Sequence, residues 1–387
     1  MSETPATAPR QVKITETGDC TRLRLVGPIS RGTVLVGLVR DAAKAADDDP
    51  LLFAHSIFWE SREICRAFLS LGFDVDVIDF EAPMPRSAAR YVATLTLHHH
   101  LVALKPALPA NAINIMWLTG SHPEVQNARE RQRIQALEAR RDCVYQPKRQ
   151  IPKAAVEVVA LDMADHCALI GNQVTLATYP RHLQAKAELF CVSAANIGHI
   201  KSASMFVPEP REFVWFAASG AVLKGLDLLL ELFSAKELPT LHIVGLLDQE
   251  EDFLNIYHAE LDNHPRIRRY GFLRGSDPKL AAIFDRCVAV IYPSASESMS
   301  AAVAHCLQVG LYPIISRATG IDLPSGCGRY LEQCSIEEID AAVTDVLQKS
   351  DADLRSEIAT LQAMALERFS REAFRARLLE VFARWLA

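Results

Sequence analysis

The sequence predicts an α/β protein made of two doubly wound domains that face a central cleft. Three observations support this fold class. The chain has 387 residues, more than the roughly 250 to 300 at which a single hydrophobic core stops growing. Strand-like apolar runs alternate with helical patterns in both halves. A segment at residues 207–213, with two prolines and three charges, separates the halves.

Composition narrows the class of protein. Half of the residues are hydrophobic and 23% are charged, the balance of a globular protein with a large core. The net charge of -6 argues against a nucleic-acid partner, because such partners select a basic surface. Nine scattered cysteines predict neither a disulfide framework nor a zinc ribbon. No apolar run approaches about 18 residues, so we expect a cytoplasmic protein without stable membrane insertion.

The first domain, residues 1–208, is expected to alternate strands and helices after a polar start. An apolar strand from residue 51 leads into a helix that carries Ile64, Phe68 and Leu71 on one face and ends at Gly72. The further expected elements are strands at 73–77, 111–119 and 166–171 and a helix at 123–141.

The second domain, residues 209–370, repeats the pattern. Its expected elements are strands at 213–219, 240–245 and 288–294 and helices at 224–237 and 277–287. Helices from about 335 to 386 close the chain, and the segment 371–387 is expected to pack back on the first domain. In such domains the ligand loops follow the carboxyl ends of the strands along the shared cleft.

A first candidate site follows the strand 213–219. Ser219 and Gly220 form a small-residue turn, and Lys224 lies at the start of the next helix. Exposed backbone N–H groups, the positive end of a helix and a lysine together suit a diphosphate. The alternative is a surface lysine, which is an unusual choice near a helix start because it opposes the helix dipole.

A second candidate site follows the strand 288–294. Glu297 stands in a serine-rich turn, and Ser298, Met299 and Ser300 lead into a helix whose first N–H groups are free. A carboxylate in this place can accept hydrogen bonds from two sugar hydroxyls. The alternative is a carboxylate that stabilises the dipole of its own helix.

The order of these parts resembles the retaining glycosyltransferases of the GT-B fold, of the family 4-like, group 1 type. Their pattern has Lys-Gly at a helix start, then a Pro-Ser turn with a glutamate, seven residues and a second glutamate. The matching positions, within residues 212–345, are Lys224–Gly225, Gly271–Phe272–Leu273, Pro293–Ser294, Glu297, Gly310 and Pro313. The resemblance implies two Rossmann-like domains, of which the first takes the acceptor and the second takes a nucleotide-sugar donor.

The resemblance also implies which residues bind the donor. They are Phe272 and Leu273 for the nucleobase, Ser219, Gly220 and Lys224 for the diphosphate, and Glu297, Ser298, Met299 and Ser300 for the sugar and its phosphate. The candidate catalytic residues are Glu297, Lys224 and, from the first domain, His122. No cofactor is expected besides the nucleotide sugar as co-substrate.

Three departures from the family pattern bear on donor binding. Ser219 stands where the family has an arginine, so one positive charge on the diphosphate is missing. Ser298 and Ser300 replace glycines and restrict the approach of the backbone. His305 replaces the second glutamate, which grips the ribose in the family. Serine and histidine still form hydrogen bonds, so we expect weaker donor binding rather than its loss.

The helical period gives His305 an expected orientation. At about 100° per residue, Val303 and Leu307 lie about 40° apart and form the expected core stripe, whereas His305 lies about 160° from each. His305 is therefore expected off the buried face, on the side of Ser298 that looks towards the donor. The alternative is a histidine that is satisfied elsewhere or solvated.

The first domain offers acceptor-side candidates. They are Trp59 and Glu60 in an expected cleft-facing turn, Gly120 and Ser121 beside His122 after the strand 111–119, and Asn172 after the strand 166–171. Trp59 suits stacking on a sugar, and a core position is the equal alternative. His122 suits a contact with the donor sugar or the acceptor, and a capping or turn role is the alternative.

Three polar runs are interpreted as structural. Residues 46–50 precede an apolar run, so we expect a solvated turn. Adjacent histidines within 97–101 diverge and lack a carboxylate nearby in sequence, so no metal site is predicted. The arginines within 129–141 are interleaved with glutamates and are expected on a solvated helix face.

The expected function is metal-independent sugar transfer, with retention, from a nucleoside-diphosphate sugar to a hydroxyl of a glycan, lipid-linked or protein acceptor. Bacterial surface polysaccharide synthesis is the setting that the resemblance implies. The alternative is a catalytically silent sugar-nucleotide-binding or assembly protein. A lipid-linked acceptor would bring the protein transiently to the inner face of the membrane. The nucleobase, the sugar and the oligomeric state stay open.

Overall fold

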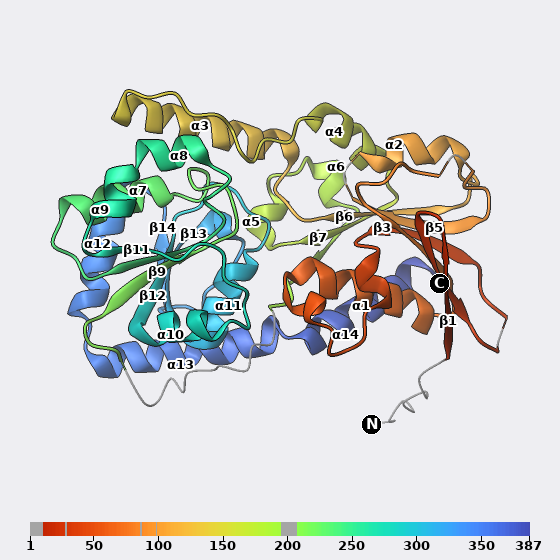
Figure 1. The fold of residues 1–387 in the computed structure, drawn as a ribbon. Coiled ribbons are helices and arrows are strands. Elements are labelled where there is room, and N and C mark those ends of the chain that lie inside the picture. The colour runs from red at the N-terminus through yellow and green to blue at the C-terminus, as the bar shows by residue number, and fades with distance from the viewer. Residues whose placement is uncertain (1–10, 28, 86, 98, 195–206) are drawn as a thin grey trace.

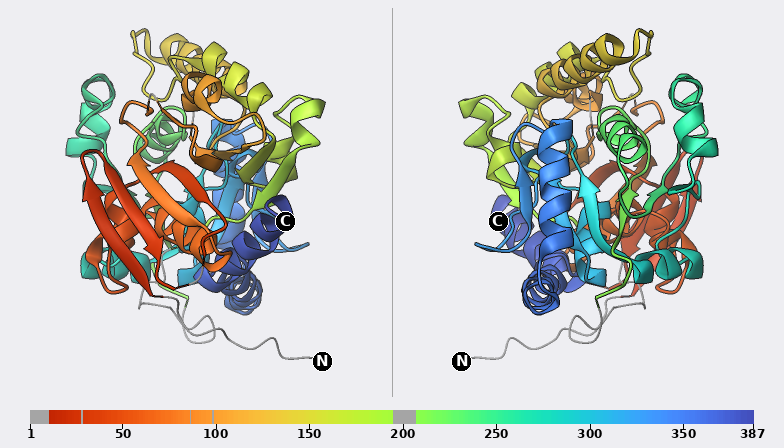
Figure 2. Two further views of the ribbon diagram at one scale, coloured as in Figure 1. Left: turned by 90° about the vertical axis from the view of Figure 1, so that its right-hand side faces the viewer. Right: turned by 90° about the vertical axis from the view of Figure 1, so that its left-hand side faces the viewer.

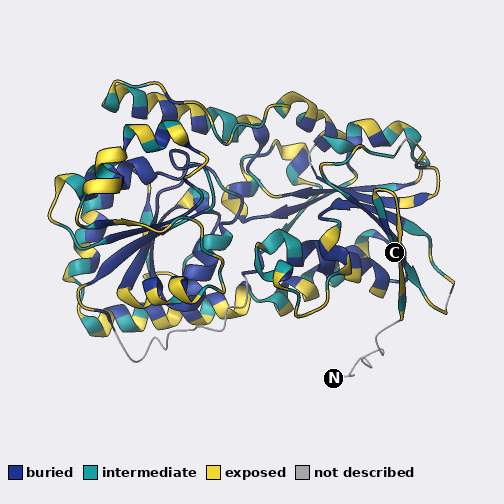
Figure 3. Cartoon of the chain, viewed as in Figure 1, coloured by how far each residue is buried: buried dark blue, intermediate teal, exposed yellow. Residues whose placement is uncertain are grey.

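Two α/β units make up the computed structural model, which describes residues 11–27, 29–85, 87–97, 99–194 and 207–387. Each unit has a central sheet with helices on both faces (Figure 1). The side views show that the strands of each sheet are twisted between these helical layers (Figure 2). The strands are mostly buried, and the exposed residues gather on the outer helices and loops (Figure 3).

The first sheet contains eight strands within the described residues. In spatial order these are β1 (Val12–Thr17), β2 (Cys20–Leu25), β4 (Asp74–Asp79), β3 (Thr33–Leu38), β5 (Tyr91–Thr96), β6 (Ile113–Leu118), β7 (His166–Ile170) and β8 (Ala187–Phe190). The strands from β4 to β8 pair in parallel, whereas β1 and β2 form an antiparallel hairpin on the β4 edge.

The second sheet is parallel throughout the described chain. Its order is β11 (Ile267–Arg269), β10 (Leu241–Val244), β9 (Glu212–Phe216), β12 (Cys287–Tyr292), β13 (Tyr312–Ser316) and β14 (Arg329–Leu331). The chain order reverses between β9 and β12, because β10 and β11 lie on one side and β13 and β14 on the other. Ligands bind at such reversal points, beyond the carboxyl ends of the strands.

Helices cover both sheets. In the N-terminal half they are α1 (Ser56–Ser70), α2 (His100–Leu104), α3 (Pro123–Arg141), α4 (Ala154–Met163), α5 (Gln173–Leu176) and α6 (Arg181–Gln184). In the C-terminal half they are α7 (Leu226–Ala235), α8 (Glu251–Ile256), α9 (His258–Asn263), α10 (Pro278–Arg286), α11 (Ala301–Val309), α12 (Ile336–Gln348), α13 (Asp351–Arg368) and α14 (Arg371–Trp385). In the part of the chain that the structure describes, no helix has both the length and the apolar character to cross a bilayer.

Most expected elements are present, and one is wrong. The helix expected at 123–141 is α3 with the same bounds. The strand expected from residue 51 is instead a short 3-10 helix, η2 (Pro50–Phe53), because Asp49 caps it and Pro50 begins it. The buried strand that leads to α1 is β3, which lies within the segment expected to be polar.

The helix α14 returns to the N-terminal half. The ring of Phe382 stacks on Phe68 with the centroids 4.8 Å apart. The ring of Trp385 stacks on His166 at 4.6 Å, at the start of β7. These contacts place the end of the chain against α1 and the first sheet.

The helix α3 holds the two halves together. It lies along the upper side of the second unit, drawn in gold (Figure 1). Arg140 pairs with Asp227 and, at 2.9 Å, with Glu231 of α7. Arg141 pairs with Glu231 at 3.3 Å and with Glu260 of α9 at 2.6 Å. The expectation of a solvated face holds for Arg131, which is exposed, and is wrong for Arg140 and Arg141, which pair with an acidic surface of the other half.

Asp227 is the buried end of this contact. It is fully enclosed, and burial raises the pKa of its carboxyl to about 6, although Arg133 and Arg140 oppose the shift. One oxygen, Oδ1, has no hydrogen-bond partner among the described residues. The ionised form of Asp227 therefore depends on the arginines of α3.

Arg140→Met is expected to lower the free energy of unfolding by about 2 to 4 kcal/mol at pH 7, because it leaves a buried carboxylate without its closest cation. Chemical unfolding measures this loss. The double variant Arg140→Met/Asp227→Asn should recover at least half of it. Arg131→Met is the matched control, since Arg131 is exposed on the same helix and pairs with no described carboxylate. An equal loss in the Arg140 and Arg131 variants would contradict the assignment.

Candidate functional site

Two predicted residues meet at the reversal point of the second sheet. Lys224 follows β9 and Glu297 follows β12, and these strands are neighbours. The Nζ atom of Lys224 lies 3.5 Å from Oε1 of Glu297. The hydroxyl of Tyr292 donates a hydrogen bond to the same oxygen at 2.7 Å. The structure thus brings the lysine and the glutamate together in a mostly buried place.

Burial and charge act in opposite directions on Lys224. Burial lowers the pKa of its ammonium group, Glu297 raises it, and the nearby Arg149 lowers it further. Burial also raises the pKa of the Tyr292 hydroxyl, and Glu297 adds to that shift. Glu297 therefore favours the charged form of Lys224, and a bound anion would act in the same direction.

The turn before α11 presents two of the three expected N–H groups. No described residue accepts a hydrogen bond from the backbone N–H of Ser298 or Met299. The third, from Ser300, donates to the carbonyl of Thr319 at 3.0 Å, so the expectation is wrong for this group. The Ser300 side chain caps α11 instead.

The turn after β9 already holds a carboxylate. Glu250, which is 1% exposed, accepts hydrogen bonds from the N–H of Gly220 at 2.6 Å and of Ala221 at 3.1 Å. Tyr145 of the N-terminal half donates to the same carboxylate at 2.8 Å. An internal carboxylate thus occupies the N–H of Gly220 in this structure, and diphosphate binding at this turn stays a prediction.

A guanidinium group from the N-terminal half lies beside Ser219. The Nη1 atom of Arg149 is 3.5 Å from the Ser219 hydroxyl. The side chain of Arg149 passes over Gly220, where an added Cβ would stand 2.6 Å from its Cγ. Gly220 also has a φ of +92°, which favours glycine. No pattern in the sequence points to Arg149, which is distant along the chain from Ser219.

His55 faces the same charges. It precedes α1, and its Nδ1 accepts a hydrogen bond from the N–H of Ile57 at 3.2 Å. Burial lowers the pKa of its imidazole, and the positive charges of Lys224 and Arg149 lower it further. Sequence reasoning missed His55, since it sits between a 3-10 helix and a helix rather than after a strand.

Comparison with solved structures identifies the architecture. Sucrose-phosphate synthase from Thermosynechococcus elongatus aligns with a TM-score of 0.65 and 14% identity, over 92% of this chain and 98% of that chain. The fold is GT-B. HepE from Anabaena, in complex with UDP-glucose, aligns with a TM-score of 0.57 and 13% identity, over 91% and 99% of the two chains.

More distant similarity extends to a longer protein. TarM from S. aureus, in complex with fondaparinux, alpha-GlcNAc-glycerol and UDP, aligns with a TM-score of 0.51 and 9% identity, over 76% of this chain and 55% of that chain. No protein-family model matches the sequence, and a search of curated proteins finds no match. The predicted fold class is confirmed by these structural likenesses.

The predicted orientation of His305 in the GT-B domain is wrong. The residue is 6% exposed, and its ring lies edge-on against Phe216, at 5.8 Å, and Phe284, at 5.5 Å. Burial lowers the pKa of the imidazole to about 3, so it is neutral. The helical period describes one helix only, whereas β9 and α10 add aromatic partners on the other side. A donor contact by His305 stays a prediction.

Gly271, Phe272 and Leu273 lie in a loop after β11. Gly271 has a φ of +70°, and its carbonyl accepts a hydrogen bond from the N–H of Gly245 at 3.0 Å. Phe272 is exposed, while Leu273 packs against the core. A nucleobase contact at these two residues stays a prediction.

Several first-half candidates lie at the boundary between the halves. Ser121 donates to the carbonyl of Glu297 at 2.9 Å. Thr175 donates to the carbonyl of Ser298 at 2.6 Å. Asn172 caps α5 and donates to Asp322. The first two hydrogen bonds join the N-terminal half directly to the loop that carries Glu297, and the third joins it to the segment between β13 and β14.

Three other candidates are buried. Trp59 is 2% exposed in α1 and packs edge-on against Phe374, so the core alternative is correct. Glu60, also 2% exposed, accepts hydrogen bonds from Ser193, and burial raises the pKa of its carboxyl to about 7. Their placement in a turn is wrong, because α1 begins at Ser56. His122 packs edge-on against Tyr179 and contacts neither Lys224 nor Glu297.

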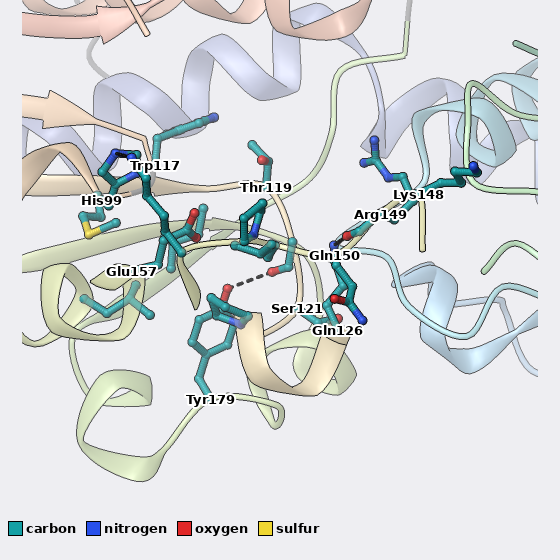
Figure 4. A pocket seen from close by; sticks show the side chains of 18 residues that line it. His99, Trp117, Thr119, Ser121, Gln126, Lys148, Arg149, Gln150, Glu157 and Tyr179 are labelled. Atoms are coloured by element: carbon teal, nitrogen blue, oxygen red, sulfur yellow. Dashed lines mark hydrogen bonds between the residues drawn. The ribbon is translucent and has the colours of Figure 1, made fainter. Parts of the chain in front are cut away.

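A cavity opens beside the loop that joins β6 to α3. Its volume is about 570 Å³. Figure 4 shows the side chains that line it. Residues that line it include Gly120, Ser121, Gln126, Arg149, Glu157 and Tyr179. The hydroxyl of Tyr179 donates to the carbonyl of Gly120 at 2.8 Å and supports the loop. The cavity thus borders two acceptor-side candidates and Arg149.

Acid unfolding tests the burial of His305. The unfolded chain binds a proton below pH 6.5 that the folded chain binds only near pH 3, so the stability contribution is complete above pH 6.5 and falls as the pH drops. The slope reaches about 1.4 kcal/mol per pH unit. Between pH 6.5 and 4.5 the wild type should lose about 2 kcal/mol more than His305→Leu. Parallel stability profiles for the two proteins would show that His305 is not buried.

Proposed function

We propose that this chain is a glycosyltransferase that moves a sugar from a nucleoside-diphosphate donor to an acceptor hydroxyl, with retained configuration and without a metal ion. The observation that carries the proposal is the Lys224–Glu297 pair at the reversal point of the second sheet. Both residues also match the sequence pattern of retaining GT-B enzymes in order along the chain.

The pair suits the two ends of a sugar-diphosphate bond. The leaving diphosphate gains negative charge as this bond breaks, and Lys224 supplies a positive charge beside it. The N–H groups of Ser298 and Met299, at the positive start of α11, add hydrogen bonds to the same phosphate. The carboxylate of Glu297 accepts hydrogen bonds from hydroxyls of the sugar and thereby orients the sugar. Contact between the two halves excludes water that would hydrolyse the donor.

UDP is the first nucleotide to test. The Anabaena structure contains UDP-glucose, and the S. aureus structure contains UDP. For the acceptor we propose the cavity bordered by Gly120 and Ser121, because it opens beside the loop that touches Glu297. A glycan, a lipid-linked sugar or a glycosylated protein remain candidate acceptors, in a cytoplasmic enzyme of bacterial glycan synthesis.

A catalytically silent binder is the competing function. Two observations favour it: the N–H groups of the β9 turn are occupied by Glu250, and His305 is enclosed by aromatic rings. Both weaken the donor site relative to the family pattern. Turnover, rather than binding, separates the two functions.

The test is a thermal-shift panel of UDP-glucose, UDP-GlcNAc, GDP-mannose and ADP-glucose, followed by assay of nucleotide release with candidate acceptors. Lys224→Met should weaken binding of the stabilising nucleotide about tenfold to a hundredfold, because a charge-assisted contact is lost. Glu297→Gln should lower kcat far more than it weakens nucleotide binding, since it contacts the sugar. Lys236→Met is the matched control, because Lys236 pairs with Asp340 at the other end of α7.

The outcomes are distinct. Binding without turnover for every acceptor favours the silent binder. Unchanged binding and turnover in both the Lys224 and Glu297 variants would show that the site lies elsewhere. Absence of binding to any nucleotide sugar would contradict the proposal.

A further inference from the structure

We propose that Arg149 provides the second positive charge for the donor diphosphate, reaching across from the N-terminal half to the place where the family pattern has an arginine and this chain has Ser219. This inference rests on the proposed function. It concerns a residue in the loop between α3 and α4, outside every matched motif.

The position of Arg149 is set by the turn after β9. Its guanidinium lies 3.5 Å from the Ser219 hydroxyl. Its aliphatic part crosses Gly220, where a Cβ would overlap Cγ at 2.6 Å. A larger residue than serine at 219 or than glycine at 220 would compete with it for this space. The small residues of the turn therefore accommodate the guanidinium.

The charge balance of the site requires such a group. The backbone N–H groups of Gly220 and Ala221 donate hydrogen bonds to the carboxylate of Glu250, so they are not available to a phosphate. The positive charge of Lys224 is already paired with the carboxylate of Glu297. Arg149 is exposed and forms no ion pair with any carboxylate in the described part of the chain. Its donors are available to an anion, and a guanidinium binds phosphate with two parallel hydrogen bonds.

The backbone of this loop is fixed to α3. Glu130, which is buried, accepts hydrogen bonds from the N–H of Lys148 at 2.9 Å and of Arg149 at 2.7 Å. Gln126 donates to the carbonyl of Arg149 at 2.7 Å. Lys148 pairs with Asp252 of α8 at 2.7 Å, which joins the loop to the second half. Arg149 is thus held at Ser219 by a rigid anchor, and the diphosphate site is complete only when the halves are in contact.

Calorimetric titration with UDP tests the inference, or with GDP or ADP where the panel selects that base. Arg149→Ser should weaken binding about tenfold to a hundredfold. Binding of inorganic pyrophosphate should fall in parallel, and binding of the nucleoside alone should not change. Adding Ser219→Arg to Arg149→Ser should restore at least about tenfold, because the guanidinium then stands where the family pattern places it. Arg149→Lys should restore less, since it lacks the planar fork.

Arg131→Met controls for a general loss of positive charge and should stay within about twofold of the wild type. Thermal unfolding of each variant checks that it is folded. If the wild type binds the nucleotide, Lys224→Met loses binding and Arg149→Ser does not, this inference is wrong while the proposed function stands. Equal losses for nucleotide and nucleoside would also overturn it, since the residue would then act on the base. If no nucleoside diphosphate binds the wild type, the proposed function fails as well.

Discussion

The contact between α3 and the acidic surface of the C-terminal half is the interaction on which the site depends. Asp227 is buried and keeps its charge only beside the arginines of α3. The same helix anchors the following loop through Glu130, and that loop carries Arg149 to the turn after β9. A buried ion pair is a weak source of stability, but it fixes the register of two surfaces when its partners have no alternative. Here that register decides which groups stand around Lys224 and Glu297.

The site is therefore shared between the halves of the GT-B fold. The C-terminal half contributes a lysine, a glutamate and two N–H groups at a helix start. The N-terminal half contributes a guanidinium and closes on the loop of Glu297 through the hydroxyls of Ser121 and Thr175. Glu250 occupies the N–H groups of Gly220 and Ala221, so in the proposed function the side chains of Lys224 and Arg149 supply the positive charge on the β9 side of the diphosphate.

Local pattern predicted much of this from the sequence. The alternation of apolar strands and helices predicts two doubly wound sheets. The proline at the start of α3 and the arginines at its end predict its bounds correctly. Lys224 and Glu297 were predicted because each directly follows a buried strand, and parallel strands bring such loops to one edge. The apolar run from residue 51 was wrongly predicted as a strand, since an apolar run after Asp49 and Pro50 fits a strand as well as a short helix.

Contacts between distant segments could not be predicted in the same way. The partners of Arg149 and Glu250 lie on other elements, and nothing in the spacing of either residue points to them. His305 was misplaced for the same reason, because Phe216 and Phe284 come from a strand and a helix outside α11. The sequence of α3 has the same pattern of charged residues whether its arginines face water or the acidic surface of the C-terminal half.

The position of a bound diphosphate is the most direct measurement of this account. A crystal structure of the chain with UDP, or with the nucleoside diphosphate that binds it, should show phosphate oxygens within about 2.7 to 3.2 Å of both the Arg149 guanidinium and the Lys224 ammonium group. A diphosphate bound by Lys224 with Arg149 turned to solvent, or a nucleotide bound away from the turn after β9, would contradict the account.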